Sequence, residues 1–207
     1  MSIQILDVHP GGKFDIEHER AIGTDGVILK AGQGHLEYKW HERAILCTMK
    51  GMPWGVYWVV DARYNPEGHK RAIKAAFPAG DFGPLGLWLD VEKPVWTMPD
   101  IVYRRLPFAY YKPVESVAQG VIAYSGKRPG IYTSPGMFKL CFGIVPVAKL
   151  RWLASLDLWS AQYKNSRPSL YGAWDKITLW QYQENPDYSV FNGSEIDFRK
   201  WLRARSA

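Results

Sequence analysis

Two carboxylates separated by one residue, Asp90 and Glu92, form the pattern in this sequence that most clearly suggests chemistry. They end the apolar run Leu85–Glu92, which predicts a buried strand. Residues two apart on a strand face the same side, about 7 Å apart along the backbone, so both carboxyls should point into one site. Mutual repulsion would raise the pKa of one member and keep it protonated near neutral pH. Such a pair is what glycosidic bond cleavage needs: one carboxyl donates a proton to the leaving oxygen, and the other stabilises positive charge at the anomeric carbon.

Taken alone, an Asp-x-Glu pattern is more often structural, with the carboxylates capping backbone groups or pairing with a cation such as Lys93. Here the first predicted strand also ends near a carboxylate, Asp7, and the last predicted strand contains Asp197. Asp is depleted in strands, so carboxylates at the ends of three strands favour a shared site. His9, which follows Asp7 by two residues, is a further candidate for substrate contact.

The elements that would position these residues alternate between β-rich apolar runs and helix-like stretches. The predicted strands are Ile3–His9, Gly26–Ala31, Trp54–Val60, Leu85–Glu92, Pro129–Thr133, Asp157–Tyr163, Ile177–Gln183 and Glu195–Phe198. The predicted helices are Leu36–Lys50, Glu67–Phe77, Asp100–Ser125 and Val147–Ser155.

Repeated β-then-α units in a chain of 207 residues predict a parallel sheet or a barrel. Several runs are continuously apolar, as in parallel strands that are covered on both faces. The later strands leave little room for helices between them. We therefore expect an α/β fold, an irregular, flattened (β/α) barrel that is TIM-barrel-like with fewer helices than strands, forming a single catalytic domain over residues 1–207. Functional groups in such barrels gather at the carboxyl ends of the strands.

The composition permits several kinds of partner. The chain has 10 Trp and 12 Tyr, whose rings either fill a core or stack on sugars and bases. Its net charge of +6 favours a polyanionic partner such as nucleic acid, acidic lipid or a bacterial wall that bears anionic polymers. The basic residues are scattered in short pairs such as Lys127-Arg128, with a denser run from Arg199 to Arg205. This pattern favours a solvated surface over a nucleic-acid-binding face.

Other signatures are weak. Cys47 and Cys141 form neither a disulfide framework nor a metal-binding motif, and two buried free thiols are expected rather than one bridge. The histidines lack ligand spacing, so we expect no metal and no cofactor. No secretory signal or membrane-length apolar run is visible. An extracellular substrate would then be reached by host lysis, by another export route or within a larger particle.

Eight stretches, in order along the chain, resemble glycoside hydrolase family 25, the Chalaropsis-type lysozymes. They are Ile5–His9, Gly26–Ala31, Gly55–Trp58, Pro84–Glu92, Pro129–Thr133, Leu158–Tyr163, Leu179–Tyr182 and Ile196–Phe198. The third stretch departs from the family pattern, because Trp58 replaces the usual His after Tyr57. Any one stretch is a weak signal, but eight in order are specific.

The resemblance implies a peptidoglycan hydrolase that cleaves the β-1,4 bond between N-acetylmuramic acid and N-acetylglucosamine. It assigns the general acid to Glu92 and the supporting carboxylates to Asp7, Asp90 and Asp197. Tyr57 and Tyr132 would line the substrate cleft, and we expect Trp159 or Trp180 to complete its wall. Bacterial peptidoglycan is the expected partner, acted on by a monomer without nucleic acid or membrane insertion. A phage or prophage endolysin acting from the host cytoplasm is the expected setting.

Two alternatives remain. Family 18 chitinases also end a strand in Asp-x-Glu, but their signature has further Asp residues at positions that are Leu85 and Trp88 here. A non-catalytic wall-binding or virion module could keep the barrel without turnover. The intact carboxylate set argues against such a module, since unneeded buried charges cost stability.

Overall fold

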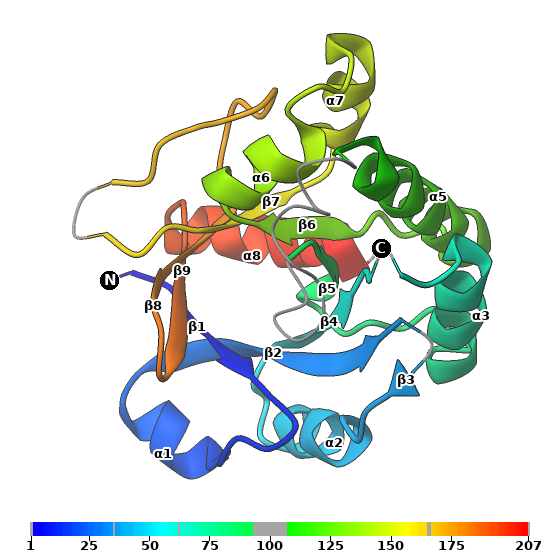
Figure 1. Cartoon of the computed structure of the whole chain (residues 1–207). Helices are drawn as coiled ribbons and strands as arrows, with labels where there is room; N and C mark the ends of the chain where they lie inside the picture. Colours follow the sequence, from blue (N-terminus) through cyan, green and yellow to red (C-terminus); the bar gives the residue numbers. More distant parts are fainter. Residues whose placement is uncertain (1, 35, 62, 93–106, 165–166, 207) are drawn as a thin grey trace.

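A closed, irregular barrel forms the centre of the computed structural model, which describes residues 2–34, 36–61, 63–92, 107–164 and 167–206 (Figure 1). The barrel strands follow one another in the order β1-β2-β4-β5-β6-β7-β8-β9, with β9 pairing back onto β1, and the short β3 lies on the edge of β2. The bounds are β1 Gln4–Val8, β2 Thr24–Gln33, β3 Leu36–Glu37, β4 Trp54–Val59, β5 Gly86–Asp90, β6 Gly130–Thr133, β7 Leu158–Ala161, β8 Leu179–Gln183 and β9 Asp187–Phe191. The predicted barrel is confirmed.

Seven helices accompany the nine strands of the described part of the chain, so helices are fewer than strands, as predicted. They are α1 Ile16–Ala21, α2 His41–Met49, α3 Pro66–Ala76, α5 Pro107–Ser125, α6 Pro135–Phe142, α7 Val147–Leu153 and α8 Glu195–Ser206. Residues 100–106 of the predicted third helix lie outside the described residues. None of these helices combines the length and the apolar character that a bilayer crossing requires.

Strand direction changes at β9. From β1 and β2 round to β8 the neighbouring barrel strands are parallel, whereas β9 runs antiparallel to both β8 and β1. The first residue of β9, Asp187, therefore lies at the carboxyl end of β1, directly opposite Asp7. The sequence prediction missed β9, and with it this pairing.

Two apolar layers hold the barrel. The inner cluster lies within the ring of strands and includes Tyr57, Trp88 and Trp159. The outer cluster joins the other face of the strands to the helices and includes Trp58. Tyr57 and Trp58 separate in this way because successive side chains of a strand point to opposite faces. Trp58, the departure from the family pattern, thus belongs to the outer layer, where its Nε1 donates to the Gly34 carbonyl at 3.3 Å.

The predicted strand Glu195–Phe198 is wrong, because these residues form the first turn of α8. Ser194 and Asp197 hold that turn by a reciprocal cap. The Asp197 backbone N–H donates to Ser194 Oγ at 3.2 Å, and the Ser194 N–H donates to Asp197 Oδ2 at 3.0 Å. This is the geometry of a capping box, and Ser-x-x-Asp was a readable sign of a helix start.

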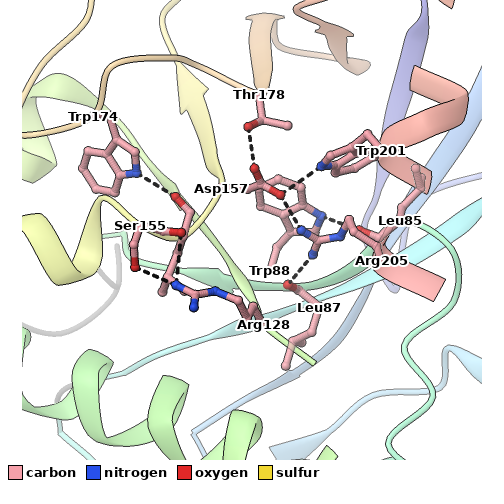
Figure 2. Close-up of polar contacts among 11 residues, drawn as sticks. Leu85, Leu87, Trp88, Arg128, Ser155, Asp157, Trp174, Thr178, Trp201 and Arg205 are labelled. Atoms are coloured by element: carbon pink, nitrogen blue, oxygen red, sulfur yellow. Dashed lines mark hydrogen bonds and ion pairs between the residues drawn. The ribbon is translucent and has the colours of Figure 1, made fainter. Parts of the chain in front are cut away.

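Helix α8 closes the end of the barrel at which the parallel strands begin. Phe198 and Trp201 pack onto the inner cluster, and Arg205 lies against the start of β5 (Figure 2). Gly86, at φ +71°, permits this approach, since a Cβ there would lie 2.3 Å from Arg205 Nη2. The helix therefore blocks one end of the barrel and leaves the carboxyl ends of the strands for a site.

The cysteines are free and buried, as expected from the sequence. Cys47 lies in α2 and Cys141 in α6. Burial raises the pKa of each thiol to about 12. Both therefore behave as apolar core groups rather than as nucleophiles.

Candidate active site

Asp90 and Glu92 meet at the carboxyl end of β5, as the sequence predicts. Asp90 is the last residue of the strand and is 4% exposed, whereas Glu92 is exposed two residues later. The two carboxyls lie close enough for each to shift the pKa of the other. Asp90 Oδ1 is buried with no partner among the described residues. Two neighbouring carboxyls with raised pKa values resist ionising together, so the pair favours one bound proton between a buried and an accessible group.

Burial and proximity keep this proton bound. Desolvation raises the pKa of Asp90 well above its usual value, and the charge of Glu92 raises it further. The pKa of Glu92 is also raised, because desolvation disfavours its charged form, although Asp90 and the charge of Lys30 oppose the shift. The proton therefore belongs to the pair, and Glu92 is the member that can deliver it outward.

A second group of hydrogen-bonded residues lies at the ends of β1 and β9. His9 Nε2 lies 3.1 Å from Asp187 Oδ2, and His9 Nδ1 lies 3.0 Å from the hydroxyl of Tyr57. The hydrogen bond with Asp187 raises the pKa of His9, burial opposes this shift, and the charge of Asp7 adds to it where Asp7 is ionised. The histidine is thus held between two partners, with a bias towards its charged form.

Asp7 interacts electrostatically with both groups of residues. Burial raises its pKa to about 8, and the charges of Asp187 and Glu92 raise it while those of His9 and Lys30 lower it. Its Oδ1 is buried without a partner among the described residues. Asp7 is therefore predominantly protonated at neutral pH and becomes an anion only above it.

Lys30 supplies a positive charge to the site from β2. Its Nζ lies 5.6 Å from the ring centroid of Tyr38 and 5.7 Å from that of Tyr57, its neighbour on β4. Its charge lowers the pKa of Asp90 and Glu92, as it does that of Asp7. Lys30 therefore limits how far the carboxylate cluster shifts towards its neutral form.

Aromatic residues form the floor of the site. Tyr57 and Tyr132 are buried, and the Tyr132 hydroxyl donates to Gln181 Oε1 at 2.6 Å. Trp159 lies beneath both tyrosines, with its ring centroid 6.4 Å from that of Tyr57 and 4.5 Å from that of Tyr132. It is 1% exposed, and its Nε1 donates to Ser189 Oγ at 2.9 Å. Trp159 thus supports the tyrosines from within the barrel instead of presenting a face to substrate.

Two sequence-predicted residues lie elsewhere. Trp180 packs with the outer cluster, and its Nε1 donates to the Gln162 carbonyl at 2.8 Å. Its neighbour Gln181 is the residue of β8 that reaches the site. Asp197 is exposed on α8, where hydrogen bonds from Ser194 lower its pKa. The structure therefore brings together Asp7, His9, Tyr57, Asp90, Glu92 and Tyr132 and gives neither Trp180 nor Asp197 a place among them.

Three residues of the site were missed from the sequence, namely Lys30, Gln181 and Asp187. Lys30 had a readable signal, because it is a lone cation in the apolar run Val27–Ala31. Asp187 begins a short alternating segment after Pro186, which indicates a strand start. Its partnership with Asp7 depends on the antiparallel direction of β9, which composition does not encode.

The donor atoms of Asp7, His9 and Asp187 lie within 4.8 Å of one another, a spacing that a metal ion could use. Both ring nitrogens of His9 are already engaged, one with Tyr57 and one with Asp187. Hydrogen bonding accounts for this group without an ion. Chemically, the whole site offers a bound proton at an accessible carboxyl and several carboxylates that can face a positive charge.

The barrel of seven parallel strands and one antiparallel strand, with its carboxylates at one end, defines the structural class of this chain. Solved structures of that class include the lysozyme from Streptomyces coelicolor, with 17% identity, 99% of each chain covered and a TM-score of 0.80. A muramidase from Acremonium alcalophilum shows 20% identity over 98% of this chain and 99% of its own, with a TM-score of 0.79. A family GH25 lysozyme from Aspergillus fumigatus shows 17% identity over 98% and 99%, with a TM-score of 0.77. No family model and no curated protein sequence matches the chain. This likeness establishes the fold, which is the one the sequence resemblance implied.

Proposed function

We propose that this protein is a muramidase, which hydrolyses the β-1,4 bond between N-acetylmuramic acid and N-acetylglucosamine in bacterial peptidoglycan. The observation that carries the proposal is the pair of interacting carboxyls, Asp90 buried and Glu92 exposed, at the carboxyl end of the barrel. The muramidases and lysozymes that share the fold support the same reading.

Glu92 acts as the general acid in this proposal. It is the exposed member of the pair, so it can place a proton on the scissile glycosidic oxygen. As the proton leaves, the pair becomes fully anionic, and Asp90 faces the positive charge that develops at the anomeric carbon. Asp187 adds negative charge to the same site. Asp187 thus takes the supporting role that the sequence resemblance gave to Asp197.

The closeness of the pair favours net retention of configuration. Inverting glycosidases hold their two carboxyls about 6.5–9.5 Å apart to seat a water molecule. Asp90 and Glu92 lie at the end of one strand and are close enough to shift each other's pKa. The second group would then be either Asp90 as the nucleophile or the N-acetyl group of the substrate, oriented by Asp90.

Peptidoglycan is the proposed partner, and a monomer acting without nucleic acid remains our expectation. The proposed setting is that of a phage or prophage endolysin, which meets the wall after release from the host cytoplasm.

Digestion of purified bacterial walls tests the proposal. Walls are incubated with the protein while turbidity is followed, and the soluble fragments are then reduced with borohydride and analysed by mass spectrometry. A muramidase leaves new reducing ends on N-acetylmuramic acid, so muramitol should appear. Reduced glucosamine ends, or released amino groups without new reducing ends, would contradict the proposal. Unchanged walls would favour the non-catalytic wall-binding module.

A further inference from the structure

A pocket of about 320 Å³ lies at the end of the barrel opposite the carboxylate cluster. Its wall contains the first residues of β5, the loop before β6, the residue before β7 and one face of α8 (Figure 2). Among the residues that line it are Lys127, Arg128, Asp157 and Arg205. The volume is at the lower end of the range for small-molecule sites, which is about 300–1,000 Å³.

Arg205 neutralises the carboxylate of this pocket. Its Nη1 donates to Asp157 Oδ2 at 2.7 Å, and its guanidinium lies 5.1 Å from the ring centroids of both Trp88 and Trp201. The Trp201 Nε1 donates to the same Asp157 oxygen at 2.9 Å. The ion pair with Arg205 lowers the pKa of Asp157, so this carboxylate is ionised and its charge is balanced by that of Arg205. Arg205 and Asp157 together add no net charge.

Two cations then remain uncompensated. Arg128 is exposed, and its Nη2 donates to the carbonyl and hydroxyl oxygens of Ser155, at 3.1 and 2.6 Å. These bonds hold the guanidinium in the wall of the pocket without neutralising it. Lys127 is half-buried beside it and has no carboxylate partner among the described residues. The pocket therefore carries a net charge of about +2, which favours an anion.

The lining also has an apolar part. Phe82, Leu87 and Leu156 contribute to the same cavity as the two cations. A phosphate group would pair with Arg128 and Lys127, since a guanidinium offers several fixed donors to phosphate oxygens. A polyol attached to that phosphate would contact the apolar residues through its C–H groups.

We propose that this pocket binds the phosphodiester backbone of an anionic wall polymer and so holds the protein on the wall. The inference rests on the proposed function, because the wall that carries the peptidoglycan also carries such polymers. The pocket and the carboxylate cluster lie at opposite ends of the barrel, so both can be occupied together. Binding in the pocket would thus raise the local concentration of the enzyme at its substrate without entering the chemistry.

Calorimetric titration with a defined poly(glycerol phosphate) tests the pocket without any turnover. The double variant Lys127→Gln/Arg128→Gln should bind at least tenfold more weakly than the wild type. The matched control is Lys74→Gln/Lys139→Gln, which removes two exposed cations from α3 and α6 with the same change in net charge. The control should stay within twofold of the wild type. An equal loss in both variants would overturn the proposal, since binding would then follow total charge alone.

Three further measurements make the result specific. Lys127→Gln alone removes no side-chain hydrogen bond of the described structure, so it should weaken binding several-fold with an unchanged melting temperature. Inorganic phosphate should compete with the polymer only at much higher concentration, and duplex DNA should bind more weakly than the polymer. Tighter binding of DNA, or unchanged binding by Lys127→Gln and the double variant, would contradict the proposal.

The catalytic variant separates this inference from the proposed function. Glu92→Gln should bind poly(glycerol phosphate) as the wild type does, because Glu92 lies at the other end of the barrel. A wild-type protein that binds the polymer but releases no muramitol from walls would remove the muramidase proposal and leave the pocket. Muramitol production by a wild-type protein, together with equal polymer binding by the double variant and its control, would remove the pocket proposal and leave the muramidase proposal.

Discussion

Asp7 and Asp187 lie directly opposite each other on the antiparallel strands β1 and β9. Two carboxylates in this position repel each other. His9 binds Asp187 at 3.1 Å, and burial raises the pKa of Asp7 to about 8, so one of the two is paired and the other stays mostly neutral. Pairing of Asp187 and protonation of Asp7 together limit the charge repulsion among the acidic residues at the carboxyl end of the barrel.

Asp187→Asn should slow wall digestion much more than Asp197→Asn does. Asp187→Asn removes a charge that acts on Asp7, His9 and Glu92, so the rate of wall digestion should fall at least about tenfold. Asp197→Asn changes only a helix cap on α8 and should retain more than about half of the rate. The measurement is initial turbidity loss at equal protein concentration. A larger loss for Asp197→Asn than for Asp187→Asn would restore the assignment made from the sequence.

Lys30 allows a prediction about pH dependence. Its charge lowers the pKa of Asp7, Asp90 and Glu92, so Lys30→Met should raise the pKa of all three. Both limbs of the pH–rate profile should move to higher pH, by about one unit. The exposed Lys74→Met is the control and should leave the profile in place. A Lys30→Met profile that coincides with that of the wild type would show that Lys30 does not act on the titrating groups.

Asp7 allows a prediction about stability. Its pKa is about 8 in the folded protein and near 3.8 in the unfolded chain, so folding takes up a proton between these values. Stability from this group therefore falls as pH rises from about 4 to 8. Asp7→Asn removes that fall, and its melting temperature relative to the wild type should increase between pH 5 and pH 8. A rise of roughly 3 °C or more is expected, since 1 kcal/mol shifts the midpoint by about 2–4 °C in proteins of this size. A constant or decreasing difference in calorimetry at the two pH values would contradict the shifted pKa.

Local patterns in the sequence predicted the seven parallel barrel strands and Asp7, Asp90 and Glu92. These features can be predicted because continuous apolar runs and carboxylates at strand ends are visible in short stretches of sequence. The pairing of Tyr57 with His9 follows from the same elements, since β1 and β4 end at the same side of the barrel.

Three sequence predictions differ from the structure for physical reasons. Ile196-Asp197-Phe198 reads as a strand, but Ser194 and Asp197 form a capping box that starts a helix. Trp180 faces the outer layer because its neighbour Gln181 faces the site, and successive side chains of a strand point to opposite faces. Trp159 does face the inside of the barrel, as a residue of the cleft wall should. Tyr57 and Tyr132 pack above it, however, and bury its ring beneath the floor of the site.

The variant Glu92→Gln tests most directly whether Glu92 delivers the proton to the glycosidic oxygen. The change keeps the volume of the side chain and removes the transferable proton. General acid catalysis is worth about 10²–10⁴-fold, so muramitol release should fall at least about a hundredfold. The melting temperature, measured on the same preparation, should stay equal or rise, because Asp90 then lies beside a group that is neutral at every pH. Near-normal muramitol release by a folded Glu92→Gln protein would contradict the account.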